Sequence, residues 1–309
     1  MWSKFGIPSR PIFDPMWTFV ITVAATVLIY LLFAGFERWG VRSHWAITIN
    51  YYVAAILGWN LAGGASAMTA TVEASWLGPL AILGLAFYPL FRLTARCSQE
   101  LGVSVATIST KLSMAIPVLV FALFDGWHLV HWGQWCGLAL AFPAVWLSAQ
   151  GPTTSPQKSG SRRLSAAWMP VVMFLGSGTI DLMFGWHSAH PSLDLPGMRM
   201  AFASVPFTLG ALVGTLDQIR GQKGWPSLRD LAGGTVLGVV NFGSLYFLLL
   251  AFDAGFFERT LVVPLLNLSV IVVATLAGAL LLSDIPHAKA RWGVALATAS
   301  IGLMMWFGQ

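Results

Sequence analysis

One ionisable side chain, Lys111, lies near the centre of the apolar run SVATISTKLSMAIPVLV, residues 104–120. A charge at the centre of a membrane-spanning helix is costly and is seldom kept without a use. The lysine ammonium is a compact point charge on a flexible stem, and it can bind a carboxylate or a phosphate. The sequence therefore predicts that Lys111 either binds an anionic ligand or has a counter-charge inside the membrane.

A second ionisable residue, Asp181, lies in the apolar run that contains GSGTIDLMFGW. At 1.5 Å per residue, Lys111 is roughly 15 Å and Asp181 roughly 20 Å from the same membrane face. Both therefore fall near the midplane, facing a shared cavity or each other. Three interpretations stay open: an ion pair or two separate polar contacts that only lock the halves together, a lysine that binds a substrate carboxylate or phosphate, or an aspartate that takes up a proton or releases Lys111 during a transport cycle.

Uncharged polar residues inside the apolar runs complete the candidate substrate-binding set. A single intramembrane Asn commonly hydrogen-bonds a neighbouring helix. With three of them present, we expect Asn241 and Asn267 to line the cavity, whereas either interpretation holds for Asn50. The two serines either return a hydrogen bond to their own helix or line the cavity. The whole predicted set is Lys111, Asp181, Asn241, Asn267, Asn50, Ser113 and Ser269.

Metal and enzyme chemistry find weaker support. The segment DGWHLVH contains Asp125, His128 and His131, and two histidines three residues apart can share a helical face. The segment lies at a span boundary and no further strong ligand is close, so we interpret the histidines as interfacial. Cys97 and Cys136 stand singly, without a CxxC motif, and are interpreted as packing residues. The sequence predicts no catalytic residue, no metal and no cofactor. A membrane-embedded enzyme remains the rival class of protein.

The composition sets the class of protein. The chain has 309 residues, of which 57% are hydrophobic and 9% charged, and its mean hydropathy is +0.74. A soluble domain carries about 25% charged residues, so the chain is expected to be an all-α integral membrane protein. Its formal net charge of +5 is explained by basic loops on one side of the membrane. No basic stripe or aromatic-basic module predicts a nucleic-acid partner.

Ten apolar runs are long enough to cross about 30 Å of hydrocarbon. They lie at 16–36, 45–62, 76–95, 101–123, 132–150, 167–187, 196–216, 229–251, 256–283 and 287–308.

The basic residues predict how these spans are oriented. Most of the 17 Lys and Arg residues fall in the connections after the odd-numbered spans: Arg38, Arg42, Arg92, Arg96, Lys158, Arg162, Arg163, Arg220, Lys223, Arg229, Lys289 and Arg291. The positive-inside rule places those connections in the cytoplasm and both termini outside. We expect a multi-pass protein of the cytoplasmic (inner) membrane of a bacterium.

The two halves of the chain resemble each other. Residues 151–166, rich in Gly, Ser, Pro and basic residues, form a predicted cytoplasmic linker between units 1–150 and 167–309. A shift of 156 positions places KLS at Lys111 over NLS at Asn267, and WCGLALAFPAVWL over RWGVALATASIGL. Since each unit has five spans, the second enters the membrane from the opposite side. We therefore expect two inverted-topology repeats around a central cavity at the midplane.

These features resemble a known family. The segments GVSVATISTKLSMAIPVLV and GLALAFPAVWL in one half, and LGVVNFGSLYFLLLAFDAG and VVPLLNLSVIVVATLAGALLLSDIP in the other, are similar to the drug/metabolite transporter superfamily, in particular to bacterial EamA-type members. In the second half, Asp284 before Gly293 matches the family pattern, whereas the first half has His128 at the corresponding position. The resemblance implies a ten-helix bundle with a central cavity.

The predicted function is a secondary active transporter. The resemblance implies export or exchange of amino acids and other small metabolites. The repeats predict alternating access, and Lys111 favours a substrate with a carboxylate, such as an amino acid or an organic acid. Proton coupling through Asp181 is one of the open interpretations. Beside the enzyme, the alternative is a broad-specificity drug exporter of the same fold. Expected partners are a small-molecule substrate and membrane lipid.

Overall fold

The computed structural model describes residues 15–125, 131–149, 166, 168–188, 190–221, 224–254, 259–284 and 286–307. Over these ranges the protein is helical and has no strand. The elements are α1 (Pro15–Phe36), α2 (Ser43–Ala62), α3 (Ala65–Val72), α4 (Leu77–Glu100), α5 (Val103–Lys111), the 3-10 turn η2 (Leu112–Met114), α6 (Ala115–Asp125), α7 (Trp132–Ala149), α9 (Trp168–Ser188), the 3-10 turn η4 (Pro191–Asp194), α10 (Met198–Arg220), α11 (Leu228–Ala254), α12 (Arg259–Leu282) and α13 (Ala288–Trp306).

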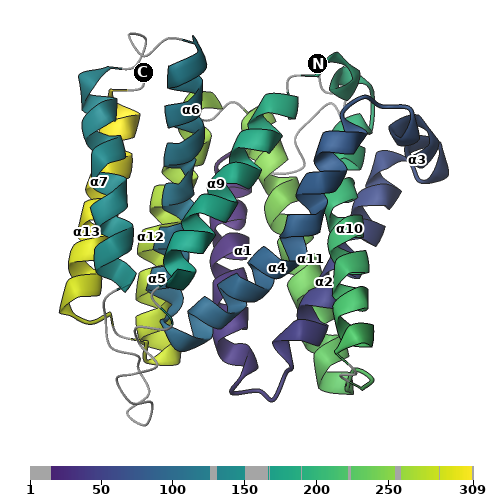
Figure 1. Ribbon diagram of the computed structural model, residues 1–309, viewed down its shortest axis with the longest axis horizontal. Helices are drawn as coiled ribbons and strands as arrows, with labels where there is room; N and C mark the ends of the chain where they lie inside the picture. Colours follow the sequence, from purple (N-terminus) through teal and green to yellow (C-terminus); the bar gives the residue numbers. More distant parts are fainter. Residues whose placement is uncertain are drawn as a thin grey trace.

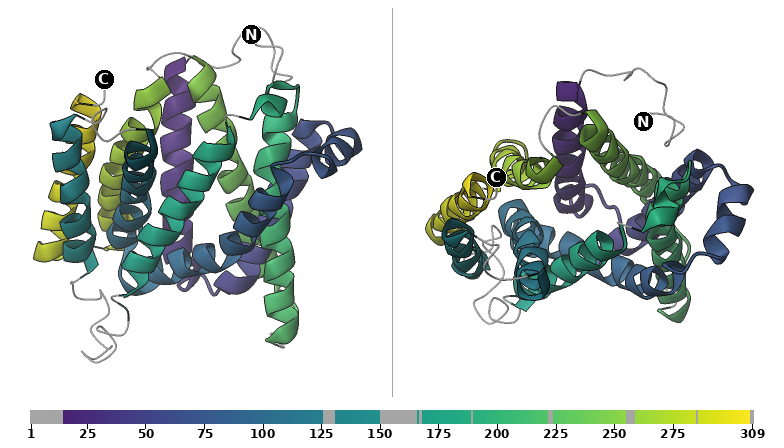
Figure 2. Two further views of the ribbon diagram at one scale, coloured as in Figure 1. Left: turned by 45° about the horizontal axis from the view of Figure 1, so that its top comes forward. Right: turned by 90° about the horizontal axis from the view of Figure 1, so that it is seen from above.

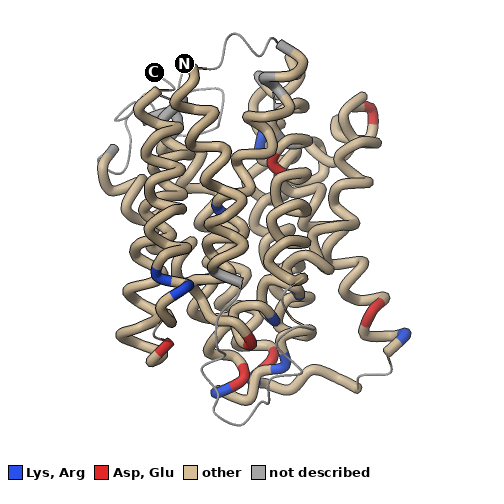
Figure 3. Tube along the Cα trace, turned by 60° about the vertical axis from the view of Figure 1, so that its left-hand side comes forward, with Lys and Arg blue, Asp and Glu red and all other residues tan. Residues whose placement is uncertain are grey.

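The long helices stand side by side in one bundle. The pair α7 and α13 lies at one edge, α3 and α10 lie at the other, and α1 lies between them (Figure 1). Helix α1 begins and α13 ends at the same end of the bundle (Figure 2). Most Lys, Arg, Asp and Glu residues gather at the opposite end, which we call the charged end (Figure 3). The charge asymmetry expected from the sequence is therefore present in three dimensions.

Seven helical segments among the described residues are long and apolar enough to cross a membrane. The bent pair α2 and α3 would make an eighth. The chain is therefore a multi-pass, all-α membrane protein. Each predicted span contains a helix of the structure, but α7 and α13 do not meet the length and hydropathy criterion, so a count of ten spans stays a prediction.

A sharp bend separates α2 from α3. The two helix axes differ by 94°, and the turn is made by Gly63 and Gly64, whose φ angles are 111° and 67°. Left-handed backbone of this kind favours glycine, which has no Cβ to clash with the following carbonyl. The sequence analysis did not predict a separate helix at 65–72.

The predicted span at 101–123 is broken in its middle. Helix α5 ends at Lys111, η2 follows, and α6 begins at Ala115. Pro117 explains the position of the break, because proline removes the hydrogen bond to the carbonyl four residues earlier and its ring clashes with that carbonyl. That carbonyl belongs to Ser113, inside η2. The sequence thus places a distortion of the helix next to its only lysine.

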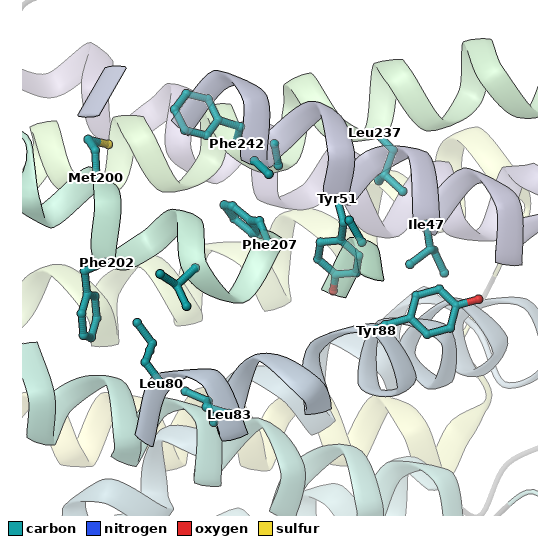
Figure 4. Close-up of a cluster of buried hydrophobic side chains, with 14 of the residues drawn as sticks. Ile47, Tyr51, Leu80, Leu83, Tyr88, Met200, Phe202, Phe207, Leu237 and Phe242 are labelled. Carbon is teal, nitrogen blue, oxygen red and sulfur yellow. The ribbon is translucent and has the colours of Figure 1, made fainter. Parts of the chain in front are cut away.

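Small residues allow α2 to pack closely against its neighbours. Gly234 and Gly238 of α11 face α2, and a Cβ at Gly238 would lie 2.8 Å from the carbonyl oxygen of Asn50. Helix interfaces in membranes are enriched in small residues four apart for this reason. Beside this contact, α2, α4, α10 and α11 enclose a buried cluster of aromatic and aliphatic side chains that includes Tyr51 and Phe207 (Figure 4).

Several helices that the sequence predicts to be repeat equivalents pack against each other. Helix α2 contacts α10, α5 contacts α12, and α7 contacts α13. Helix α4 packs on α10, and its predicted counterpart α11 packs on α2. At the α7–α13 contact, the Ser300 hydroxyl donates a hydrogen bond of 2.6 Å to the Gly137 carbonyl. These pairings agree with a duplicated chain, while the inverted repeat itself stays a prediction.

Candidate functional site

The α5–η2–α6 break carries the polar residues of the candidate site. Residues 103–109 of α5 are buried, whereas Thr110 and Lys111 are half-buried, and Ser113 in η2 is fully buried. Thr110 and Lys111 are therefore the least buried residues of α5. The break also orients Lys111 and Ser113 differently from a continuous helix.

The Ser113 hydroxyl joins the break to α9. It lies 2.9 Å from the Asp181 carboxylate and 2.6 Å from the carbonyl oxygen of Thr110. The Thr110 hydroxyl in turn lies 2.5 Å from the hydroxyl of Tyr30 on α1. A polar chain therefore runs from α1 through α5 and η2 to α9, in a region that is otherwise apolar.

Asp181 lies on the protein-facing side of α9 and is nevertheless exposed. At 3.6 residues per turn, Asp181 shares a face with Phe174 and Gly178, which are both buried. The exposed residues Leu175 and Thr179 lie on other faces of the helix. Asp181 contacts Ser113 of η2 and is exposed, so its carboxylate borders accessible space between α9 and the broken span. Gly185, one turn further from the charged end, is also exposed.

No ion pair joins Lys111 and Asp181 in the described structure. Their charges are near enough to interact electrostatically, but the hydrogen-bond partner of the carboxylate is Ser113. The sequence had left open whether the two form an ion pair that locks the helices together. In this structure the ammonium and the carboxylate border the same interior region without direct contact.

Asn267 lies directly beside Lys111. Its side-chain amide donates to the Lys111 backbone carbonyl at 3.2 Å and lies 3.2 Å from the sulfur of Met114. The amide thus supplies a donor to a carbonyl at the end of α5, where helical carbonyls lose their intrahelical partners. Asn267 therefore supports the break that positions Lys111.

Asn50 and Asn241 form a second, separate polar contact. Their side-chain amides meet at 3.1 Å between α2 and α11, and both residues are buried. Such a contact is typical of hydrogen bonding between membrane helices. Ser269 is half-buried in α12, and no hydrogen bond to a described residue is found for it. Of the predicted set, the structure brings together Lys111, Ser113, Asp181 and Asn267.

The sequence analysis missed Tyr30 and Thr110. Tyr30 is buried in α1, and its hydroxyl needs a hydrogen-bond partner at membrane depth. A tyrosine well inside the first span was therefore a usable signal, because tyrosines of membrane proteins favour the interfaces. Thr110 directly precedes Lys111, but nothing in the sequence identifies its partner.

The charged end is closed by contacts between the two halves of the chain. The Asp284 carboxylate, after α12, accepts a hydrogen bond of 2.6 Å from the Val103 amide at the start of α5. The Arg38 guanidinium donates to the Leu282 carbonyl at 2.6 Å. Gly102 has a φ of 102°, and a Cβ there would lie 2.7 Å from the Asp284 carboxylate oxygens. These contacts hold the end of α12 against the start of α5 and the segment after α1.

Metal binding finds no support among the described residues, which contain no cluster of three His, Cys, Asp or Glu residues. His131 stacks on Phe307 with ring centroids 4.6 Å apart, and the side chain of Asp125 and residue His128 lie outside the described part. Cys97 is buried, Cys136 is exposed, and neither is in a disulfide. The linker predicted at 151–166 also lies outside the described residues, except for Ala166.

The fold and the site together define a multi-pass helical membrane protein with an ionisable cluster in its interior. An uncharacterized protein of Haemophilus influenzae is 25% identical over 203 residues, covering 65% of this chain and 66% of that protein. The match therefore spans just under two thirds of the relative's length. A crystal structure of another protein matches with a TM-score of 0.54 at 15% identity, covering 94% of this chain and 98% of that one. No family model matches.

The structural match extends over nearly all of both chains, so the whole bundle is a fold that a solved structure shares. At 15% identity the match carries the fold alone. The sequence relative has no stated activity. Substrate and mechanism therefore rest on the residues of this chain.

Proposed function

We propose that this protein is a secondary transporter that moves a small polar metabolite across the cytoplasmic membrane by alternating access. The observation that carries the proposal is the interior position of Lys111 and Asp181, near each other without an ion pair, beside accessible space in the middle of the bundle. Ionisable residues placed in this way in a membrane protein mark substrate or ion pathways.

The helix arrangement supports alternating access. The α2–α10, α5–α12 and α7–α13 contacts are those expected if an internal two-fold axis relates an inverted pair of five-helix units. In transporters with inverted repeats, the substrate site lies near the midplane where the repeats meet. The Lys111–Asn267 contact lies between two predicted repeat equivalents, where such an axis would pass. The resemblance to EamA-type transporters favours the same class of protein.

The exposed residues of α9 and the contacts at the charged end favour one conformation of an alternating-access cycle. Asp181 and Gly185 of α9 are exposed, whereas at the charged end the Asp284 and Arg38 hydrogen bonds join the two halves of the chain. Under the positive-inside rule the charged end faces the cytoplasm. The conformation then corresponds to an outward-open state of the transporter.

The chemistry of the site favours an anionic substrate. Lys111 supplies a positive charge, and Asn267 donates to its backbone carbonyl rather than neutralising the ammonium. A carboxylate of an amino acid or organic acid would replace the solvation that the ammonium loses on burial. Export is the favoured direction by the family resemblance.

A ligand-stabilisation screen followed by a flux assay tests the proposal. Purified protein is heated with amino acids, organic acids, phosphate esters and hydrophobic cations, and each stabilising compound is then tested for counterflow in proteoliposomes. We expect a carboxylate compound to stabilise the protein and to exchange unchanged. A converted product would indicate the membrane enzyme, and stabilisation by hydrophobic cations would indicate the drug exporter. Stabilisation without any flux would contradict transport.

A further inference from the structure

We propose that Asp181 and Ser113 form a proton-binding site, and that proton binding there is coupled to anion binding at Lys111. The proposal rests on a comparison between the hydroxyl hydrogens of Tyr30, Thr110 and Ser113 and the acceptor oxygens that these hydroxyls contact. The coupling to the anion rests on the transporter proposed above. The proton site itself is a property of the protein without substrate, and it can be tested alone.

The hydrogen count begins at Tyr30. The Thr110 hydroxyl donates its single hydrogen to the Ala106 carbonyl at 2.9 Å. With its hydrogen on the Ala106 carbonyl, the Thr110 hydroxyl accepts the tyrosine hydrogen in its contact with Tyr30. This end of the chain is complete, and it has no hydrogen to spare for Ser113 or Asp181.

Ser113 has one hydrogen and two acceptors. Its hydroxyl lies 2.6 Å from the Thr110 carbonyl oxygen and 2.9 Å from Asp181 Oδ2. With Asp181 ionised, the single Ser113 hydrogen has to serve both acceptors, and sharing it weakens each contact. With Asp181 protonated, the acid donates to Ser113 and Ser113 donates to Thr110. Each short contact then has a hydrogen of its own, so the geometry favours the neutral acid.

A proton can reach Asp181, and its transfer to the carboxylate conserves atoms and charge. Asp181 borders accessible interior space, so a hydronium ion there can transfer its proton to the carboxylate and leave as water. One O–H bond forms at Asp181, the Ser113 O–H bond is kept, and the serine hydrogen turns toward Thr110. The reverse steps release the proton. No electron transfer and no co-reactant are needed.

The charged and titratable groups around Asp181 define the coupling. Helix α9 packs against α4, α5, η2, α6 and α7. Lys111 of α5 interacts with Asp181 electrostatically, and Tyr30 of α1 does so across Thr110. The neighbouring helices carry other titratable side chains among the described residues. Tyr88 and Arg92 contact Asp217, and Arg96 pairs with Glu100. The remaining two are the thiols of Cys97 and Cys136.

Neutralising Asp181 changes what Lys111 can bind. While Asp181 is ionised, its negative charge stabilises the ammonium and repels an incoming anion. Once Asp181 is protonated, the ammonium loses its counter-charge, and an anion binds it more tightly. By linkage, the anion favours the protonated acid to the same extent. The site therefore carries an anion and a proton together, and the concentration gradients of both determine the direction in which such an electroneutral pair moves.

Infrared difference spectroscopy tests the proton site without any substrate. Purified protein in lipid nanodiscs is titrated from acid to alkaline pH, and the carbonyl stretch of protonated carboxylic acids is recorded. We expect a band in the wild type that Asp181→Asn removes and Asp217→Asn leaves in place. Ser113→Ala should shift its frequency, because the acid loses its hydrogen-bond acceptor. Lys111→Met should keep the band to higher pH, because the stabilising cation is gone.

The outcomes separate the two proposals. If Asp181→Asn has the same band as the wild type, the proton site is wrong, whatever the flux assay shows. If the band behaves as expected but no compound is moved, the transporter is wrong and the proton site stands. Asp181→Glu, which keeps a titratable group, covers the case in which Asp181→Asn does not fold, and it should restore a carboxylic acid band at a shifted frequency.

Discussion

The side-chain amide of Asn267 donates a hydrogen bond to the backbone carbonyl of Lys111, 3.2 Å away and 156 residues earlier in the chain. The same number of residues is the shift at which the two halves of the sequence resemble each other. The contact joins the end of α5 to α12, at the level where the span is broken. It connects the polar site to the interface between the two halves of the chain.

Replacing Asn267 should destabilise the break. Asn267→Ala leaves the Lys111 carbonyl without its donor, at a cost of about 1–3 kcal/mol in free energy of unfolding. Thermal or denaturant unfolding in detergent measures this loss. Ser269→Ala on the same helix is the matched control, and it should change the stability by less than about 0.5 kcal/mol. Equal effects of the two variants would argue against a supporting role for Asn267.

Lys111→Met should leave a folded, membrane-inserted protein that no longer moves substrate. Methionine keeps much of the side-chain volume but removes the charge on which anion binding depends. Counterflow in proteoliposomes, with size-exclusion chromatography as the check on folding, measures the effect. Full transport by this variant would assign Lys111 to structure alone.

Gly238→Ala should destabilise the α2–α11 contact. The added Cβ would lie 2.7 Å from the Val53 Cβ, and such overpacking costs about 1–3 kcal/mol. Gly243 lies on the same helix and has open space around it. Gly243→Ala is therefore the control, and it should be neutral or stabilise the protein by up to about 1 kcal/mol through helix propensity. The unfolding midpoint should fall in Gly238→Ala and stay the same or rise in Gly243→Ala.

A double-mutant cycle tests the Asn50–Asn241 pair. Each single change to Ala should lower stability, and the double change should cost less than the sum, with a coupling energy of about 0.6 kcal/mol and at most about 1.7. Transport should persist in all three variants, because these amides contact each other rather than Lys111. Loss of flux at unchanged stability would instead place the pair in the substrate path.

Asp284 should give the stability a measurable pH dependence. Burial raises the pKa of Asp284, against the lowering effects of the Val103 amide and Arg38. The folded protein then binds more protons than the unfolded chain above the ordinary carboxyl pKa of about 3.9. The Asp284 contribution to stability therefore falls as the pH rises from there through the raised pKa, and is constant above it. Asp284→Asn should remove this slope; a slope unchanged in that variant would contradict the assignment.

Local signals in the sequence were sufficient to locate the long helices. Hydropathy over about 20 residues located every long helix of the described structure, because the bilayer requires a continuous apolar segment of that length. Pro117 carried the information for the break at Ser113, but its consequence for Lys111 was not drawn from the sequence. The bend at Gly63 and Gly64 was missed because a pair of glycines does not specify its own angle.

The sequence by itself determined that this is a helical membrane protein, where its helices lie, and that Lys111 and Asp181 are at similar depth. Only the tertiary structure decided that Asp181 bonds Ser113, that Asn267 holds the Lys111 carbonyl, and that Asn50 meets Asn241. Depth follows from residue count along one helix. Contact depends on the rotation and tilt of two helices, which are fixed by many weak packing interactions with all of their neighbours.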